Sequence, residues 1–305
     1  MAILIVLLAA VFAAISNFFM RRTLDGGGTP QGFLLLQFGT SLILNLAVCP
    51  QAIQDMGRAG PVLGIGAVAG LCVFGMMCAT GRALASGPPG LTFAALNAAT
   101  VLPGPVMAIL FGMAFGFDLT TAQMVGLFLV LLGLFWAARH ERAPWRWFVP
   151  SGVALLLHAT LMVIMQWRCL LMRVDLPTHH LLPIRLEPSM EGWFLPGMFL
   201  AAFAAQILFF GATERRWPRT AEWINGLAGG AANGAGAWCL VQGIVAATGP
   251  EHVMIFPLFA IAIIAFTNGW SRWLYREKVS WGATALCGLG ILVGTVAWTR
   301  LGWLT

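Results

Sequence analysis

Residues 119–138 read LTTAQMVGLFLVLLGLFWAA, and no charged side chain interrupts them between Asp118 and Arg139. A helix rises about 1.5 Å per residue, so about 20 apolar residues cross the hydrocarbon core of a bilayer. A helix is the form expected there, because lipid offers no hydrogen-bond partner to an exposed peptide group. The stretch therefore predicts a transmembrane helix.

The same pattern, an apolar block bounded by charged residues, recurs along the whole chain. One longer connection, residues 168–191, contains several prolines and histidines and is expected to be an irregular surface loop with a short interfacial helix at 168–174. The sequence thus predicts an all-α membrane protein with about ten transmembrane helices, near residues 2–20, 30–48, 61–81, 91–115, 120–138, 147–167, 192–213, 220–247, 253–274 and 280–299.

The composition excludes a water-soluble protein. Hydrophobic residues make up 59% of the chain and charged residues 9%, whereas soluble domains contain about 25% charged residues. The 17 Arg and Lys residues and the net charge of +6 are explained by short loops that face lipid headgroups, so no nucleic-acid partner is implied. The six cysteines form no CxxC pair and are expected to be reduced, buried thiols.

Two halves of the chain look related. Residues 1–139 form a first five-helix repeat, 140–146 a basic connecting loop and 147–305 a second five-helix repeat. Thr120 and Ser280 occupy matching positions before the last helix of each half, where a helix N-cap hydroxyl belongs. Because each half has an odd number of spans, the second half would enter the membrane from the opposite face. Inverted repeats of this kind build the central sites of many carriers.

Three segments carry a resemblance to a known family. GRALAS at 81–86 leads into a helix that Pro103 and Pro105 are expected to interrupt, YREKVS at 275–280 leads into a glycine-spaced helix, and Ser16-Asn17 precedes a pair of arginines. On these segments the chain resembles the drug/metabolite transporter superfamily, specifically its EamA-like ten-helix permeases. The resemblance implies an inverted-repeat fold, a carrier function and cytoplasmic termini.

Loop charges favour the opposite orientation. If the termini are cytoplasmic, the cytoplasmic loops hold only five of the 17 basic residues. The positive-inside rule instead places the loops richer in Arg and Lys on the cytoplasmic side. The sequence leaves the orientation open. Those five are Arg58, Arg168, Arg173, Arg185 and Arg300.

Polar side chains inside the predicted spans are candidates for substrate contact, because placing them in lipid is costly. No carboxylate lies at mid-depth in these spans, so a proton- or cation-driven multidrug antiporter is the less favoured mode. The predicted substrate-binding residues are Asn17, Arg82, Asn97, His158, Asn225, Asn233, Asn268 and Arg272.

Each of these candidates also has a structural interpretation. Asn17 and His158 either line a cavity or bond between helices, a contact worth about 0.6 kcal/mol in membranes. Arg82 and Arg272 either bind an anionic group or extend to the headgroups. If Arg272 binds such a group, Asn268, one turn before it on the same face, is expected to act with it. Glycines of 61–81 and 220–247 either pack helices closely or leave room for substrate. Glu222 is expected to pair with Arg216 or Arg219 at the membrane surface.

The predicted function is a secondary transporter or facilitator. It would move a small polar metabolite, such as an amino acid or another neutral, zwitterionic or anionic solute, by alternating access. The alternatives are a membrane-embedded enzyme acting on a lipid or isoprenoid, for which His179, His180 and Asp175 come closest to a ligand cluster, and a non-transporting scaffold. We expect no enzyme activity, catalytic residue, cofactor or metal, and a monomer or homodimer in a bacterial inner membrane.

Overall fold

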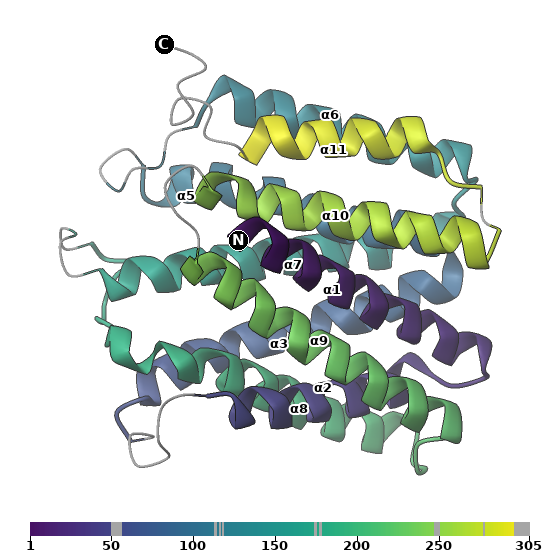
Figure 1. Cartoon of the computed structure of the whole chain (residues 1–305), viewed down its shortest axis with the longest axis horizontal. Coiled ribbons are helices and arrows are strands. Elements are labelled where there is room, and N and C mark those ends of the chain that lie inside the picture. Colours follow the sequence, from purple (N-terminus) through teal and green to yellow (C-terminus); the bar gives the residue numbers. More distant parts are fainter. Residues whose placement is uncertain are drawn as a thin grey trace.

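A computed structural model describes residues 1–49, 57–112, 115, 117, 119–173, 176, 179–246, 251–276 and 278–295. Helices and connecting turns make up these residues, and no strand occurs among them (Figure 1). The all-α prediction is confirmed for this part of the chain. Asp118, Asp175 and Arg300, which the sequence analysis used, lie outside it.

The helices follow the predicted order along the chain. They are α1 (Ala2–Asp25), α2 (Pro30–Ala47), α3 (Gly60–Ser86), α4 (Pro89–Ala98), the short 3₁₀ helix η2 (Ala99–Val101), α5 (Pro103–Leu110), α6 (Thr121–His140), α7 (Trp145–Met172), the 3₁₀ helix η4 (Pro188–Trp193), α8 (Phe194–Thr213), α9 (Thr220–Ala246), α10 (Glu251–Leu274) and α11 (Trp281–Thr295).

Two predicted helix starts are confirmed by capping hydrogen bonds. The Thr120 hydroxyl accepts from the Gln123 N–H at 3.2 Å, and the Gln123 side-chain oxygen accepts from the Thr120 N–H at 3.1 Å, which is a capping box. The Ser280 hydroxyl accepts from the Ala283 N–H at 3.4 Å. These bonds occupy peptide N–H groups that the first helical turn leaves without partners.

The predicted helix over 91–115 is broken. α4 ends at Ala98, η2 follows, and α5 begins with Pro103, which supplies no N–H for an intrahelical bond. The predicted interruption by proline is therefore confirmed, and the single continuous helix is wrong. The separate short helix expected at 168–174 is also wrong, since α7 continues as one helix to Met172.

Within the described part of the chain, seven helical segments are long and apolar enough to cross a membrane, so the chain is a multi-pass membrane protein. α2, α9 and α11 lie outside this set, and α11 has only 15 residues. The ten crossing helices, the inverted repeat and the division at 140–146 stay predictions. The seven are Ala2–Asp25, Gly60–Ser86, Pro89–Leu110, Thr121–His140, Trp145–Met172, Pro188–Thr213 and Ile255–Leu274.

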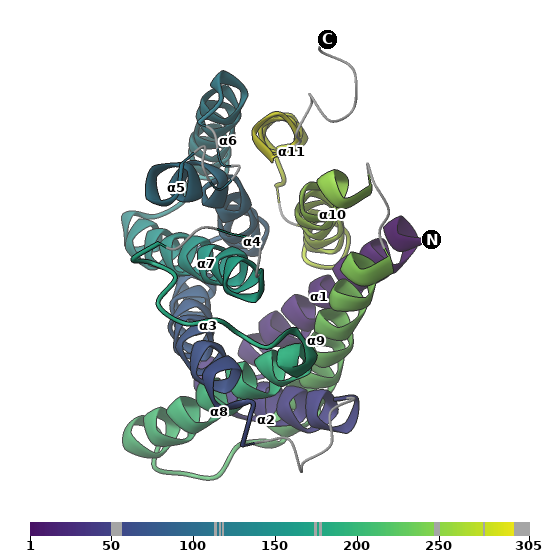
Figure 2. The same ribbon diagram turned by 90° about the vertical axis from the view of Figure 1, so that its left-hand side faces the viewer.

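Eight helices pack side by side in a closed ring. α1 contacts α9, α9 contacts α2, α2 contacts α8, and α8 contacts α3; the ring continues through α7 and α4 to α10, which returns to α1. α6 and α11 pack against each other outside this ring, as Figure 2 shows. Polar groups on the inner face of the ring are therefore shielded from lipid by neighbouring helices.

Glycines let ring neighbours approach at backbone distance. A Cβ at Gly70 of α3 would lie 2.2 Å from the Met198 carbonyl oxygen of α8, and one at Gly230 of α9 would lie 2.7 Å from the Gln37 carbonyl oxygen of α2. Only glycine fits at such contacts. The close-packing interpretation of these two glycine-rich helices is confirmed at both positions.

Candidate functional site

An aromatic cluster joins three ring helices on the side of α1 near its C-terminal end. The Trp270 ring of α10 lies 5.7 Å from Phe18 of α1 and 6.4 Å from Phe93 of α4, both edge-on. Trp270 also stacks edge-on against Tyr275 at 5.7 Å, and the Arg21 guanidinium lies 5.6 Å from the Tyr275 ring centre. The cluster closes the ring where α1, α4 and α10 meet.

One face of α10 beside this cluster carries polar atoms without partners. Thr267, Trp270 and Ser271 are spaced three and four residues apart, so they share that face. Thr267 and Ser271 are fully buried. Among the described residues, the two hydroxyls and the Trp270 indole nitrogen have no hydrogen-bond partner. A buried polar atom without a partner costs about 1–3 kcal/mol, which suits a site that a polar ligand completes.

Asn17 lies near the same cluster on α1. It is half-buried, and its side chain makes no hydrogen bond among the described residues. Met20, one turn further on, reaches across the ring to Gly81 of α3, where an added Cβ would lie 3.1 Å from the methionine Cε. Asn17 shares this face. Its amide is therefore available on the inner side of the ring.

His158 connects α7 to the break in α4. Its Nδ1 lies 2.6 Å from the Leu96 carbonyl oxygen. That oxygen can only accept, so Nδ1 carries the proton and donates. His158 therefore performs the interhelical bonding considered in the sequence analysis, while Nε2 has no partner among the described residues.

Asn97 is engaged by its own helix. Its side-chain amide donates to the Phe93 carbonyl oxygen at 2.8 Å, and the Thr100 hydroxyl donates to the Asn97 carbonyl oxygen at 2.9 Å. These local bonds stabilise the last turn of α4 before η2. Asn97 nevertheless lies one turn after Phe93, on the face of α4 that meets Trp270.

The two predicted asparagines of α9 differ in their partners. Asn233 donates to the Ser41 hydroxyl at 3.1 Å, and Ser41 donates to the Gly230 carbonyl oxygen at 3.1 Å, so both bond across the α2–α9 contact. Asn225 is buried, with 6% of its surface exposed, and makes no hydrogen bond among the described residues. Of the two asparagines, Asn225 is therefore the one whose side chain has no hydrogen-bond partner among the described residues.

Asn268 bonds to a neighbouring helix. It donates to the Thr284 hydroxyl of α11 at 2.8 Å, and its side-chain oxygen lies 2.5 Å from where a Cβ of Gly90 in α4 would stand. It therefore holds α4, α10 and α11 together. The proposed joint action of Asn268 with Arg272 has no support in this geometry, because the Arg272 side chain is exposed.

Arg82 is also exposed, at the C-terminal end of α3. The exposure of Arg82 and Arg272 agrees with side chains that extend to the headgroups. The structure thus brings Asn17 and Asn97 toward the aromatic cluster and leaves these two arginines at the surface.

A second polar cluster lies where the α1–α2 turn meets the α8–α9 turn. Glu222 is fully buried and accepts from Arg216 at 2.7 and 2.8 Å, from the Arg219 N–H at 2.6 Å, and from the Thr29 N–H and hydroxyl at 2.7 and 3.0 Å. The predicted pairing with Arg216 is confirmed. A Cβ at Gly32 would lie 2.3 Å from the carboxyl carbon of Glu222, so glycine makes room for this carboxylate.

Arg216 completes the charge balance of this cluster. It also pairs with Glu214 at 2.9 Å. The hydrogen bond to Glu222, followed by the charges of both carboxylates, raises the pKa of Arg216 above its ordinary value, although partial burial opposes the shift. The guanidinium therefore stays charged, and Glu222 has every oxygen satisfied.

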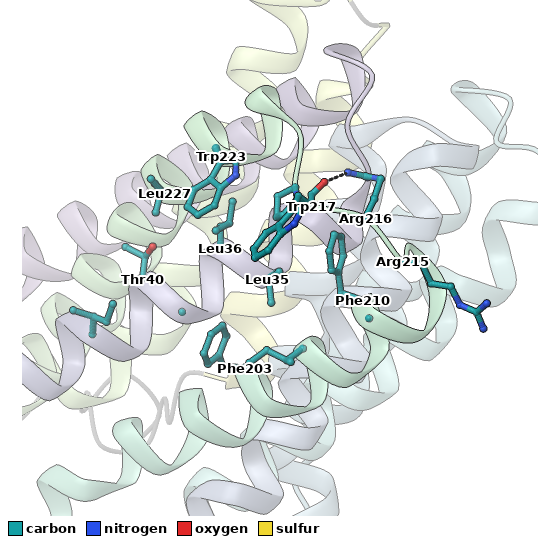
Figure 3. Close-up of a pocket in the computed structure, with 15 residues that line it drawn as sticks. Leu35, Leu36, Thr40, Phe203, Phe210, Arg215, Arg216, Trp217, Trp223 and Leu227 are labelled. Carbon is teal, nitrogen blue, oxygen red and sulfur yellow. Dashed lines mark hydrogen bonds between the residues drawn. The ribbon is translucent and has the colours of Figure 1, made fainter.

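A surface pocket of about 730 Å³ lies on the outer side of the ring between α2, α8 and α9. Figure 3 shows Leu35, Leu36, Phe203 and Phe210 along it, with Trp217 and Trp223 at one end. The Arg215 side chain points away from these residues (Figure 3). Arg216, which also lines the pocket, is paired with Glu214 and Glu222, so the pocket is an apolar groove without an unpaired charge directed into it.

His179 and His180 do not form a metal site with other ligands among the described residues. His179 stacks against Phe111 and Phe115, at 5.3 and 5.1 Å, and its Nδ1 accepts from the Leu181 N–H at 3.2 Å. These contacts place His179 against the end of α5. They give His179 a packing role.

Sequence reasoning missed the α10 face and the aromatic cluster. Thr267 and Ser271 flank the predicted Asn268, and the four-residue spacing of two small hydroxyl residues in an apolar span was the available signal. Phe18, Phe93 and Trp270 gave no signal, since aromatic residues are common in every span. All six cysteines are free thiols, as expected, but the prediction that they are buried is wrong for Cys169, which is exposed, and for Cys49 and Cys72, which are half-buried.

The fold has a counterpart among solved structures. One, described only as "Crystal structure of protein", matches this chain with a TM-score of 0.58 and 18% identity, covering 96% of this chain and 96% of its own. A likeness at this identity concerns the fold alone. No family model matches the chain, and no curated protein matches it. Fold and site together define a helical multi-pass membrane protein with a polar inner face.

Proposed function

We propose that this protein is a secondary carrier or facilitator of a small polar metabolite. The observation that supports it most is the α10 face, where Thr267, Trp270 and Ser271 hold buried polar atoms without partners beside Asn17. Polar groups enclosed by membrane helices are costly to retain, so those without a protein partner are candidates for substrate contact. These groups are neutral, which suits a neutral, zwitterionic or anionic solute such as an amino acid.

The mechanism we propose is alternating access between two inverted five-helix halves, as in the EamA-like permeases of the drug/metabolite transporter superfamily. The bends at η2 and at Pro257 inside α10 supply places where helices can flex. Transport would require the contacts of Trp270 with Phe18 and Phe93 to part. A bacterial inner membrane and cytoplasmic termini belong to the same proposal.

The test is flux in proteoliposomes against a panel of neutral, zwitterionic and anionic metabolites, with protein-free liposomes as the blank. We expect His158→Ala and Asn233→Ala to lower flux without lowering the amount of protein in the membrane. His158→Ala removes the bond to Leu96 at the helix break, and Asn233→Ala removes the bond to Ser41. Normal flux in both variants would contradict the sequence prediction for His158 and Asn233, and normal flux in Thr267→Val would contradict the α10 site. No flux for any solute would favour the scaffold alternative.

A further inference from the structure

A small pocket lies between the end of α6 and the start of α7, apart from the ring interior. Its volume is about 250 Å³, and its lining residues are Phe135, Ala138, Arg139, Arg142, Ala143 and Phe148. Both helices are candidate membrane spans, so their connection lies at the level of the lipid headgroups. Trp145, 79% exposed and 5.6 Å from Phe148, agrees with that level.

The pocket combines two apolar walls with two cations that lack partners. Phe135 and Phe148 are 59% and 39% exposed on helices that face lipid. Among the described residues, Arg139 and Arg142 make no ion pair and their guanidinium groups make no hydrogen bond. The neighbouring Glu141 has a partner of its own. The pocket therefore carries uncompensated positive charge beside an apolar surface.

Arg142 adopts a backbone conformation that is strained for residues other than glycine. Its φ of 53° is in the left-handed region, and the Ala143 N–H bonds to the Ala138 carbonyl oxygen at 2.9 Å, which is the helix ending that normally takes glycine. Arg215 and Arg276 adopt the same conformation after α8 and α10. An arginine kept where glycine is less strained suggests that its side chain has a use.

We propose that this pocket binds an anionic phospholipid of the bilayer. The lipid phosphate would lie between Arg139 and Arg142, because guanidinium groups bind phosphate oxygens in pairs of hydrogen bonds. An acyl chain would cover Phe135 and Phe148. Basic pockets between membrane helices take lipid headgroups of this charge, and a zwitterionic lipid would leave the positive charge uncompensated. The inference does not depend on the proposed transport function.

The test compares retention of phosphatidylglycerol and phosphatidylcholine by the purified full-length protein, measured by native mass spectrometry. We expect the double variant Arg139→Gln/Arg142→Gln to lower retention of phosphatidylglycerol about thirtyfold, since each of the two basic groups contributes about 1 kcal/mol near a membrane surface and about 1.4 kcal/mol corresponds to a factor of ten. Arg22→Gln is the matched control. Arg22 is also exposed and makes no ion pair or side-chain hydrogen bond among the described residues, but it lies at the end of α1, away from the pocket.

A second variant separates lipid binding from folding. Arg142→Gly relieves the left-handed strain, so we expect an unchanged or higher melting temperature in phosphatidylcholine together with weaker retention of phosphatidylglycerol. Inorganic phosphate should not displace the lipid, because it lacks the acyl chain. Retention equal to that of Arg22→Gln in both pocket variants, or displacement of the lipid by inorganic phosphate, would overturn the proposal.

Discussion

Two buried polar regions of this protein differ in how well their hydrogen bonds are satisfied. Glu222 accepts five hydrogen bonds from Arg216, Arg219 and Thr29. On α10, the hydroxyls of Thr267 and Ser271 are just as buried and have no partner among the described residues. Both regions are polar groups enclosed by helices, so enclosure alone does not distinguish them.

The difference indicates different roles. A charged group that has all its partners stabilises the positions of the segments that supply them, here the α1–α2 turn and the α8–α9 turn. A neutral group without partners stabilises nothing until something polar reaches it. We infer that the Glu222 cluster is structural and that the α10 face is where a solute would be held.

The largest effect is expected at the satisfied cluster. Replacing Glu222 with Ala removes the partner of Arg216 and all five accepted bonds, so we expect the free energy of unfolding to fall by about 3 kcal/mol. Unfolding in a denaturing detergent measures this loss. Flux per folded molecule should change little, because the cluster lies at the edge of the ring.

Glu214→Gln provides the control for that loss. Glu214 pairs with the same arginine at 2.9 Å, but its side chain is 19% exposed. Partly exposed ion pairs contribute at most about 1 kcal/mol, so the loss should be smaller. Equal losses in the two variants would mean that burial of Glu222 does not set its importance.

The opposite result is expected on α10. Thr267→Val keeps the side-chain shape and removes a hydroxyl that has no partner, so the free energy of unfolding should stay within about 1 kcal/mol of the wild type. If the hydroxyl binds substrate, flux should fall about tenfold, which corresponds to about 1.4 kcal/mol. Proteoliposome flux and detergent unfolding of the same preparation measure both quantities.

Thr80→Val is the matched control on α3. Thr80 is equally buried, but its hydroxyl donates to the Met76 carbonyl oxygen at 2.9 Å. Its loss should lower stability by about 1 kcal/mol and leave flux per folded molecule unchanged. If Thr80→Val and Thr267→Val behave alike, the distinction between satisfied and unsatisfied groups fails.

The smallest effect concerns Tyr275, which borders the aromatic cluster and is the sole tyrosine of the chain. Burial, followed by its hydrogen bond to Asp25, raises the pKa of Tyr275 to about 12. The unfolded chain releases this proton near pH 10, so stability should decrease as the pH rises from about 10 to 12.

Ultraviolet titration of this single phenol measures the shift directly. Asp25→Asn should move the midpoint toward the ordinary value, because it removes the charged partner of the hydroxyl. A midpoint of about 10 in the wild type would show that Tyr275 is open to water, and the cluster around Trp270 would then not close this end of the ring.

Much of the fold could be predicted from the sequence. The apolar blocks predicted the helices, and Thr120 and Ser280 predicted the N-termini of two of them. Both predictions succeed because span length and capping depend on residues close together in the chain. The break before Pro103 was foreseen as an interruption but not as a 3₁₀ turn. Its form depends on packing against α7, including the bond from His158 to Leu96.

The candidate site could be predicted only in part. Asn17 was identified because any amide in a span is conspicuous, and its lack of a partner agrees with that choice. Asn268 and Asn233 were identified by the same rule, yet both bond to neighbouring helices. Composition shows which groups are polar but not which of them are satisfied.

The sequence by itself determined that this protein lies in a membrane and where most of its helices begin and end, since both follow from runs of apolar residues and from local hydrogen bonds. Only the tertiary structure decided which helices are neighbours, that Glu222 is fully bonded and that Thr267 and Ser271 are not. Hydrogen-bond partners such as Thr29 and Glu222 lie almost two hundred residues apart, and only packing brings them together.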